Sequence, residues 1–118
     1  MKFACLVYID PAVMGALSKE EDTKLTDDSI DNDKDLARRG HLMMAHALQS
    51  TATAVTIRVR NGKMSATDGP FAETKEQLGG FMLIEARDMD EAIEIITATP
   101  MAKVASMEIR PFLHLEHS

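Results

Sequence analysis

Residues 3–9 form a strand-like segment that is apolar on both faces, and this feature constrains the fold most. Its valine, isoleucine and aromatic side chains favour extended backbone, and Asp10-Pro11 ends the run. Met43-Met44 and residues 81–84 have the same two-sided apolar character. A sheet that helices cover on one side only should instead alternate apolar and polar residues. A second layer must therefore cover the other face of these strands.

The remaining patterns predict alternating strands and helices around this sheet. Expected strands cover residues 2–9, 41–48, 54–60, 63–67, 80–86 and 106–113, and expected helices cover residues 18–39 and 88–99. Asn61-Gly62 is a strong two-residue hairpin signal, and Asp88 with Glu91 forms a capping box for the second helix. Met89, Ala92, Ile93 and Ile96 form its expected packed face. With the hairpin as an insertion, the order predicts an α+β, ferredoxin-like βαββαβ fold.

The length of the chain also indicates how the second face is covered. One domain spanning residues 1–118 is expected, because no repeat or linker divides the chain. Such a domain has no further element for a second layer. A second copy placed sheet to sheet, with two-fold symmetry, is the least costly solution. We therefore expect a homodimer in which the two sheets enclose a cleft.

Composition excludes several classes of partner. Thirteen basic and 19 acidic residues give a net charge of −6, opposite in sign to what nucleic-acid binding requires. The longest apolar run is too short to span a membrane and lacks a signal-peptide cleavage region. We therefore expect a cytoplasmic protein that binds neither nucleic acid nor membrane. The single cysteine, Cys5, lies in this apolar run and is expected to be a buried, inert thiol.

The acidic residues do not predict a metal site. Asp31, Asp33 and Asp35 have the spacing of a calcium loop, but Leu36 and Leu42 stand where that loop needs glycine and glutamate. We interpret these acids as a solvated helix face. The histidines lack zinc-site spacing, and no nucleophile elbow or phosphate-binding loop is present. We predict neither a metal nor a cofactor.

Strand alternation gathers a small set of polar candidates. His46 lies in an otherwise apolar row with Leu42, Met44 and Leu48, where a satisfied core histidine is more common than a general base. Two pairs of charged residues each share one strand face: Arg58 with Arg60, and Glu108 with Arg110. Interface ion pairs and a pocket for a small anion explain these pairs equally well.

Residues 68–81 form the most distinctive segment. Gly69-Pro70 predicts a tight turn, after which Phe71 can insert into the core. Asp68 can either hold this turn or act as a base. The loop that follows adds three ionisable residues, Glu73, Lys75 and Glu76. Sites are often built on such loops, although loops also need polar residues to satisfy their backbone.

This segment resembles the signature of the YCII-related, or DGPF-domain, family. The shared features are the Asp-Gly-Pro-Phe turn at residues 68–71, the Glu-Thr-Lys-Glu stretch at 73–76 and the Gly-Gly strand entry at 79–80. Further similarities lie at residues 40–42, 56–58, 90–92 and 108–111, so the resemblance covers nearly the whole chain. It implies ferredoxin-like protomers that pair as a dimeric α/β barrel.

The resemblance implies less about function. Some members occur with extracytoplasmic-function sigma factors, and certain relatives resemble dehydrochlorinases or lyases that use a histidine–aspartate pair. Their histidine lies on the first helix, and their aspartate directly precedes a proline after the second. Here residues 18–39 contain no histidine and Thr99 precedes Pro100, so that pair is absent.

Two functions remain. The first is a dimeric small-molecule-binding protein that can act as a cofactor-free acid–base enzyme on a small anionic substrate. Its candidate catalytic residues are Asp68 and His46, and its candidate substrate-binding residues are Arg58, Arg110, Glu73, Lys75 and Glu76. The alternative is a non-catalytic regulatory or accessory module, linked to sigma-factor-type regulation, in which the loop shapes a partner surface.

Overall fold

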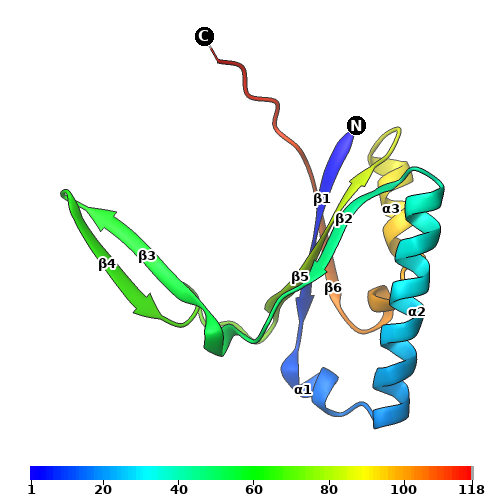
Figure 1. Cartoon of the computed structure of the whole chain (residues 1–118), viewed down its shortest axis with the longest axis horizontal. Coiled ribbons are helices and arrows are strands. Elements are labelled where there is room, and N and C mark those ends of the chain that lie inside the picture. The colour runs from blue at the N-terminus through cyan, green and yellow to red at the C-terminus, as the bar shows by residue number, and fades with distance from the viewer. Residues whose placement is uncertain (118) are drawn as a thin grey trace.

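The computed structural model describes residues 1–117 and contains a four-stranded antiparallel sheet with helices on one side (Figure 1). In chain order the elements are β1 (Lys2–Ile9), α1 (Pro11–Gly15), α2 (Lys19–Arg38), β2 (Leu42–Ala47), η1 (Thr51–Thr53), β3 (Val55–Arg60), β4 (Lys63–Asp68), β5 (Gln77–Glu85), α3 (Met89–Thr97), η2 (Pro100–Lys103) and β6 (Ser106–Pro111). The sheet order is β2-β5-β1-β6. This is the predicted α+β, ferredoxin-like arrangement, with β3 and β4 inserted as a separate two-stranded sheet.

Local side-chain chemistry explains where the helices begin. The Ser18 hydroxyl accepts a hydrogen bond from the Glu21 backbone N–H, and the Glu21 carboxylate accepts one from the Ser18 N–H. This reciprocal capping box fixes the start of α2. Asp88 caps α3 in the same way by accepting from the Glu91 N–H, as predicted. The short helix α1, which the sequence analysis did not predict, begins where Asp10 accepts from the Ala12 N–H.

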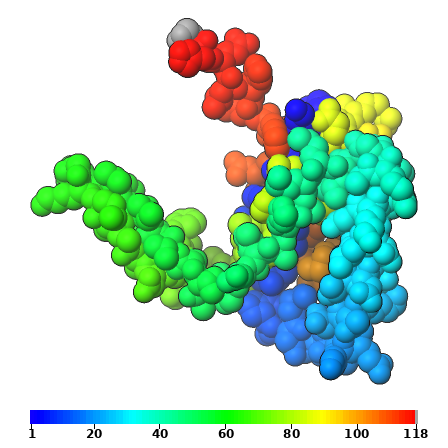
Figure 2. Space-filling model, viewed as in Figure 1, coloured from blue at the N-terminus to red at the C-terminus, as the bar shows by residue number. Residues whose placement is uncertain are grey.

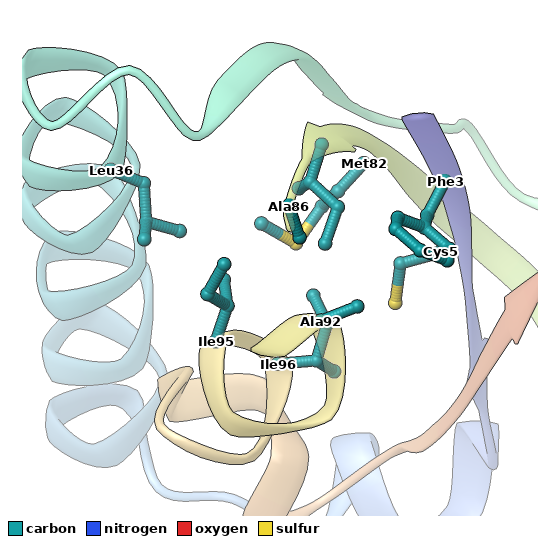
Figure 3. Packing of buried hydrophobic residues seen from close by; sticks show 9 residues of the cluster. Phe3, Cys5, Leu36, Met82, Ala86, Ala92, Ile95 and Ile96 are labelled. Carbon is teal, nitrogen blue, oxygen red and sulfur yellow. The ribbon is translucent and has the colours of Figure 1, made fainter. Parts of the chain in front are cut away.

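The hydrophobic core lies between the sheet and the two long helices (Figure 3). Phe3 and Cys5 of β1, Leu36 of α2 and Ile84 of β5 are almost completely buried. The predicted burial of Cys5 is confirmed, and burial raises the pKa of its thiol to about 11. Ile93, by contrast, is 47% exposed, so its assignment to the packed face of α3 is wrong. The buried stripe of α3 runs instead through Ala92, Ile95 and Ile96.

An irregularity in β2 determines which side chains face away from the helices. The register between β2 and β5 shifts between Leu42 and Met44. Leu42 therefore packs against the core, whereas Met44 and His46 lie on the other side of the sheet. The prediction that Leu42 shares a row with these two residues is wrong, because a bulge inserts one extra residue and reverses the alternation.

The side of the sheet opposite α2 and α3 is here called the open face. Strand register places the following side chains on it: Ala4, Leu6, Tyr8, Met44, His46, Phe81, Leu83, Glu108 and Arg110. Most of them are apolar or aromatic, as the two-sided apolar strands predicted. In the described chain, no helix or strand covers them from this side (Figure 1).

The hairpin of residues 55–68, here called the arm, projects away from the sheet on the side opposite α2 (Figure 1). Its tip is the predicted Asn61-Gly62 turn, in which both residues have positive φ, 52° and 73°. Such φ values are typical of the two-residue turns that join antiparallel strands. β3 and β4 pair only with each other, so the arm depends on its own ladder.

Candidate functional site

The face of α2 that is turned toward the sheet is apolar only toward its ends. Leu25 and Leu36 lie on this face, but Ser29, Asn32 and Asp33 occupy the turns between them. Apolar residues at such positions would pack a helix against its sheet. Ser29, Asn32 and Asp33 have short polar side chains instead, and they leave the middle of α2 separated from the strands.

The resulting cleft between α2 and the sheet has a volume of about 590 Å³. Apolar side chains from the strands and from η2 supply much of its wall, including Val7, Met82, Met101 and Met107. The orange residues of η2 are visible between α2 and the sheet in Figure 2. A cleft of this size, largely apolar with a few polar groups, is typical of small-molecule sites.

Two polar side chains of α2, Ser29 and Asp33, line this cleft. The Ser29 hydroxyl is buried and has no hydrogen-bond partner within the described chain. Desolvation raises the pKa of the nearby Asp33 carboxyl above its usual range. Burying polar groups without partners is unfavourable, so both are suited to hydrogen-bonding a ligand. Thr99, also in the lining, is already satisfied because its hydroxyl donates to the Ile96 carbonyl at 2.7 Å.

The charge of the cleft limits what it can hold. Its lining contains Asp22 and Asp33 but, within residues 1–117, neither lysine nor arginine. The two carboxylates therefore disfavour a negative charge on a ligand. The arrangement suits a molecule with an apolar body and hydroxyl or N–H donors that can reach Asp33 and Ser29.

His46 is the only one of the seven predicted site residues that borders this cleft. Its ring, however, lies beside Phe81, on the open face. Arg110 is on β6, at the opposite edge of the sheet from β2, with its Nε 4.0 Å from Glu108 Oε2. A single copy of the chain therefore does not bring His46 and Arg110 together.

Lys75 and Glu76 help to form a second, more polar pocket of about 500 Å³ at the end of β1. The Ser106 hydroxyl donates to Glu76 Oε1 at 2.8 Å, and Lys75 Nζ lies 3.7 Å from Asp10 Oδ2. The Lys75 side chain is 86% exposed, so solvent screens this ion pair strongly. Every polar group in these two contacts has a partner, which distinguishes this pocket from the cleft.

The remaining predicted residues are exposed and dispersed. Arg58 and Asp68 lie on the arm, and Glu73 lies in the loop that follows it. Two hydrogen bonds hold the turn after Asp68: the Gly69 N–H donates to the Ala54 carbonyl at 2.7 Å, and the Thr56 hydroxyl donates to the Gly69 carbonyl at 2.9 Å. Phe71 is 79% exposed, so its predicted insertion into the core is wrong.

The interpretation of the acidic helix as a solvated face is correct for some residues and wrong for Asp33. Asp31 is exposed, and Asp35 forms ion pairs with Arg38 and Arg39 at 3.2 and 3.0 Å. Asp33 instead lines the cleft. The signal was present in the sequence, because Asp33 and Ser29 lie at helical spacing between Leu25 and Leu36. Within the described residues, no three His, Cys, Asp or Glu side chains are placed to hold a metal ion.

Comparison with known proteins places this geometry in context. The family model described as "YCII-related domain" matches residues 1–115. An uncharacterized protein of Rhizobium meliloti is 39% identical over 113 residues, which cover 94% of this chain and 91% of that protein. A solved structure of 5-chloro-2-hydroxyhydroquinone dehydrochlorinase (TftG) from Burkholderia phenoliruptrix, in complex with 2,5-dihydroxybenzoquinone, is similar in fold. Its TM-score is 0.60 at 13% identity, covering 97% of this chain and 95% of that one. Among the described helices, none is long and apolar enough to cross a membrane.

Proposed function

Since the chain belongs to the YCII-related family, we propose that it binds a small hydroxylated ring compound in the cleft between α2 and the sheet and acts on it by acid–base chemistry. The observation that carries this proposal is the unsatisfied Ser29 hydroxyl in the same cleft as the partly desolvated Asp33 carboxyl. Ser29 lacks a partner, and Asp33 has a raised pKa, in a cleft whose walls are otherwise largely apolar. At these positions α2 lacks the apolar side chains that would pack it against the sheet. A bound ligand would supply the missing contacts.

Asp33 is the proposed acid–base group. A carboxyl whose pKa is raised by burial is a stronger base when ionised and holds its proton to higher pH than an exposed one. It would accept a proton from a ligand hydroxyl, and the Ser29 hydroxyl would hold a neighbouring ligand oxygen. This proposal moves the acid–base role from Asp68 and His46 to α2, because Asp68 is exposed on the arm and the His46 ring lies beside Phe81 on the open face.

The charge of the cleft favours a neutral ligand over the small anion that Arg58 and Arg110 predicted. Both arginines lie outside the cleft, and the acids in its lining repel anions. The dehydrochlorinase with a similar fold is solved with an oxygen-substituted ring. We therefore propose a planar ring that carries hydroxyl groups, remains neutral at physiological pH and lies between the apolar walls.

We propose, in addition, that the protein works as a homodimer. The open face exposes Met44, which is 46% exposed, beside the half-buried Phe81 and Leu83. Contiguous apolar surface of this kind indicates a docking site. Pairing two open faces would bury these side chains and form the dimeric barrel that the family resemblance implies.

Isothermal titration calorimetry with resorcinol and hydroquinone tests the ligand proposal. Both should bind the wild type more tightly than 2,5-dihydroxybenzoquinone does, because the enolic hydroxyls of that quinone are acidic. Ser29→Leu should narrow the cleft, remove the free hydroxyl, keep the fold and weaken binding by about tenfold or more. Asp33→Asn should alter the pH dependence of binding, whereas Asp31→Asn, on the exposed side of the same helix, should not. Binding that Ser29→Leu leaves unchanged would exclude the cleft, and no binding at all would favour the accessory-module alternative.

A further inference from the structure

The arm has two chemically different faces. Cross-strand register places Val55, Ile57 and Val59 of β3 on one face with Met64 and Ala66 of β4, and Asp68 lies at the base of this face opposite Val55. The other face carries polar and basic side chains: Thr56, Arg58, Arg60, Lys63, Ser65 and Thr67. This alternation is typical of a strand pair that packs against another surface on its apolar side only.

That other surface is not supplied by the arm's own chain. Val55, Ile57, Val59 and Met64 are between 58% and 66% exposed. A two-stranded hairpin is only marginally stable by itself in water, and an exposed row of four large apolar side chains is a docking surface or an aggregation hazard. A hairpin that projects this far with its apolar face uncovered therefore requires a partner.

The dimensions of the chain indicate how large the partner contact is. A folded monomer of 13.0 kDa exposes about 6,300 Å², whereas this chain exposes 8639 Å². Its radius of gyration is 16.5 Å, against about 13.5 Å for a compact domain of this length. The excess of exposed surface is about 2,300 Å² per chain. If two copies buried this surface against each other, the total buried area would lie in the range of permanent homodimers, about 2,000 to 5,000 Å².

The charge distribution indicates what kind of surface the arm meets. Residues 55–68 contain three basic residues and one acidic residue, a local net charge of +2. The whole chain has a net charge of −6, so the rest of the chain carries −8. The arm of one copy is therefore attracted electrostatically to the body of another.

We propose that the arm packs against a second copy of this chain: its apolar face lies on that copy, and its net positive charge attracts the acidic body of the partner during association. The arm and the open face lie on the same side of the sheet (Figure 1), so a second copy seated on the open face lies within reach of the arm. The inference rests on the homodimer proposed above and deepens it. In this arrangement both the arm, residues 55–68, and the open face contribute to the stability of the dimer.

Analytical ultracentrifugation of the full chain and two charge-matched variants tests the arm. Ile57→Lys places a lysine on the apolar face, and Thr67→Lys places one on the basic face of the same hairpin. Both positions are exposed, so both variants should keep the circular dichroism spectrum of the wild type. Ile57→Lys should weaken dimerisation by about tenfold or more, whereas Thr67→Lys should not weaken it. Equal dimerisation of Ile57→Lys and wild type would overturn the proposal.

Isotope-filtered NMR on a mixed, half-labelled sample provides a measurement that needs no variant. Contacts between copies should appear from the methyl groups of Ile57, Val59 and Met64. A dimer with intermolecular contacts only from the open face would overturn the role of the arm while leaving the dimer intact. A wild type that stays monomeric at high concentration would overturn both, but resorcinol binding in the cleft would still be measurable, so the two proposals fail separately.

Discussion

The rings of His46 and Phe81 lie beside each other across β2 and β5, with centroids 5.9 Å apart and planes tilted by 57°. The same row continues from Phe81 to Leu6 on β1 and to Glu108 on β6. Register places the side chains of this row on the open face, the side of the sheet opposite α2 and α3. An aromatic pair in this position stabilises the sheet only modestly. Its apolar surface would be buried if a second copy of the chain packed on the open face.

Phe81→Ala should therefore affect association more than folding. We expect the dimer to dissociate about tenfold more readily, because the substitution removes apolar area from the centre of the open face. Sedimentation velocity over a concentration series measures this. Leu113→Ala, in the exposed segment after β6, is the control and should leave association unchanged. Unchanged self-association of Phe81→Ala would show that the open face is not the contact surface.

Leu36→Ala should destabilise the fold by about 2–5 kcal/mol, because Leu36 is 1% exposed and joins α2 to the core beyond the cleft. Urea denaturation followed by circular dichroism measures the change. Leu113→Ala is again the matched control: Leu113 is 82% exposed, and the expected loss is below about 0.5 kcal/mol. A loss at Leu36 as small as at Leu113 would mean that α2 is not anchored through this residue.

Asp33→Asn should stabilise the protein at neutral pH. Burial raises the pKa of Asp33 in the folded state above its unfolded value, so the folded protein holds this proton more tightly. The ionised carboxyl therefore costs stability above the folded pKa, and the cost disappears below the unfolded pKa. We expect Tm to rise by a few degrees at neutral pH and by less in acid. Asp31→Asn should show no such pH dependence, and a Tm gain that grows in acid would contradict the burial of Asp33.

Cys5 should be almost unreactive in the native protein. It is fully buried and its pKa is raised to about 11, so on the order of one thiol in a thousand is ionised at about pH 8. Labelling with Ellman's reagent should be slow in buffer and immediate in denaturing urea. Equally fast labelling under both conditions would mean that β1 does not lie in a stable core.

Much of the fold followed from local chemistry that the sequence displays directly. Asn61-Gly62 identified the hairpin because few other residues adopt positive φ at both turn positions. Asp88 and Glu91 located the start of α3 through the capping box. The shift at Leu42 escaped prediction, because a bulge depends on how two distant strands pair. Gly80 shows the same dependence: a side chain there would lie 2.9 Å from the His46 carbonyl, so β5 and β2 require glycine for their close approach.

The candidate site was harder to predict. Asp33 belongs to an acidic run, and its charge alone does not separate it from its exposed neighbours. Only the position of the sheet determines which side of α2 is partly buried. The motif in residues 68–76 predicts that Phe71 inserts into the core, yet Phe71 is exposed to solvent. Charge and motif identify residues worth testing, but the partner surface that buries a side chain is set by tertiary packing.

Intermolecular NOEs between resorcinol and methyl-labelled protein test the central claim most directly. The account predicts contacts from the ring protons to Val7, Leu25 and Met107, which wall the cleft, and their loss in Ser29→Leu. Contacts confined to the Thr74 methyl group, in the pocket at the end of β1, or a spectrum that saturating resorcinol leaves unchanged, would contradict it.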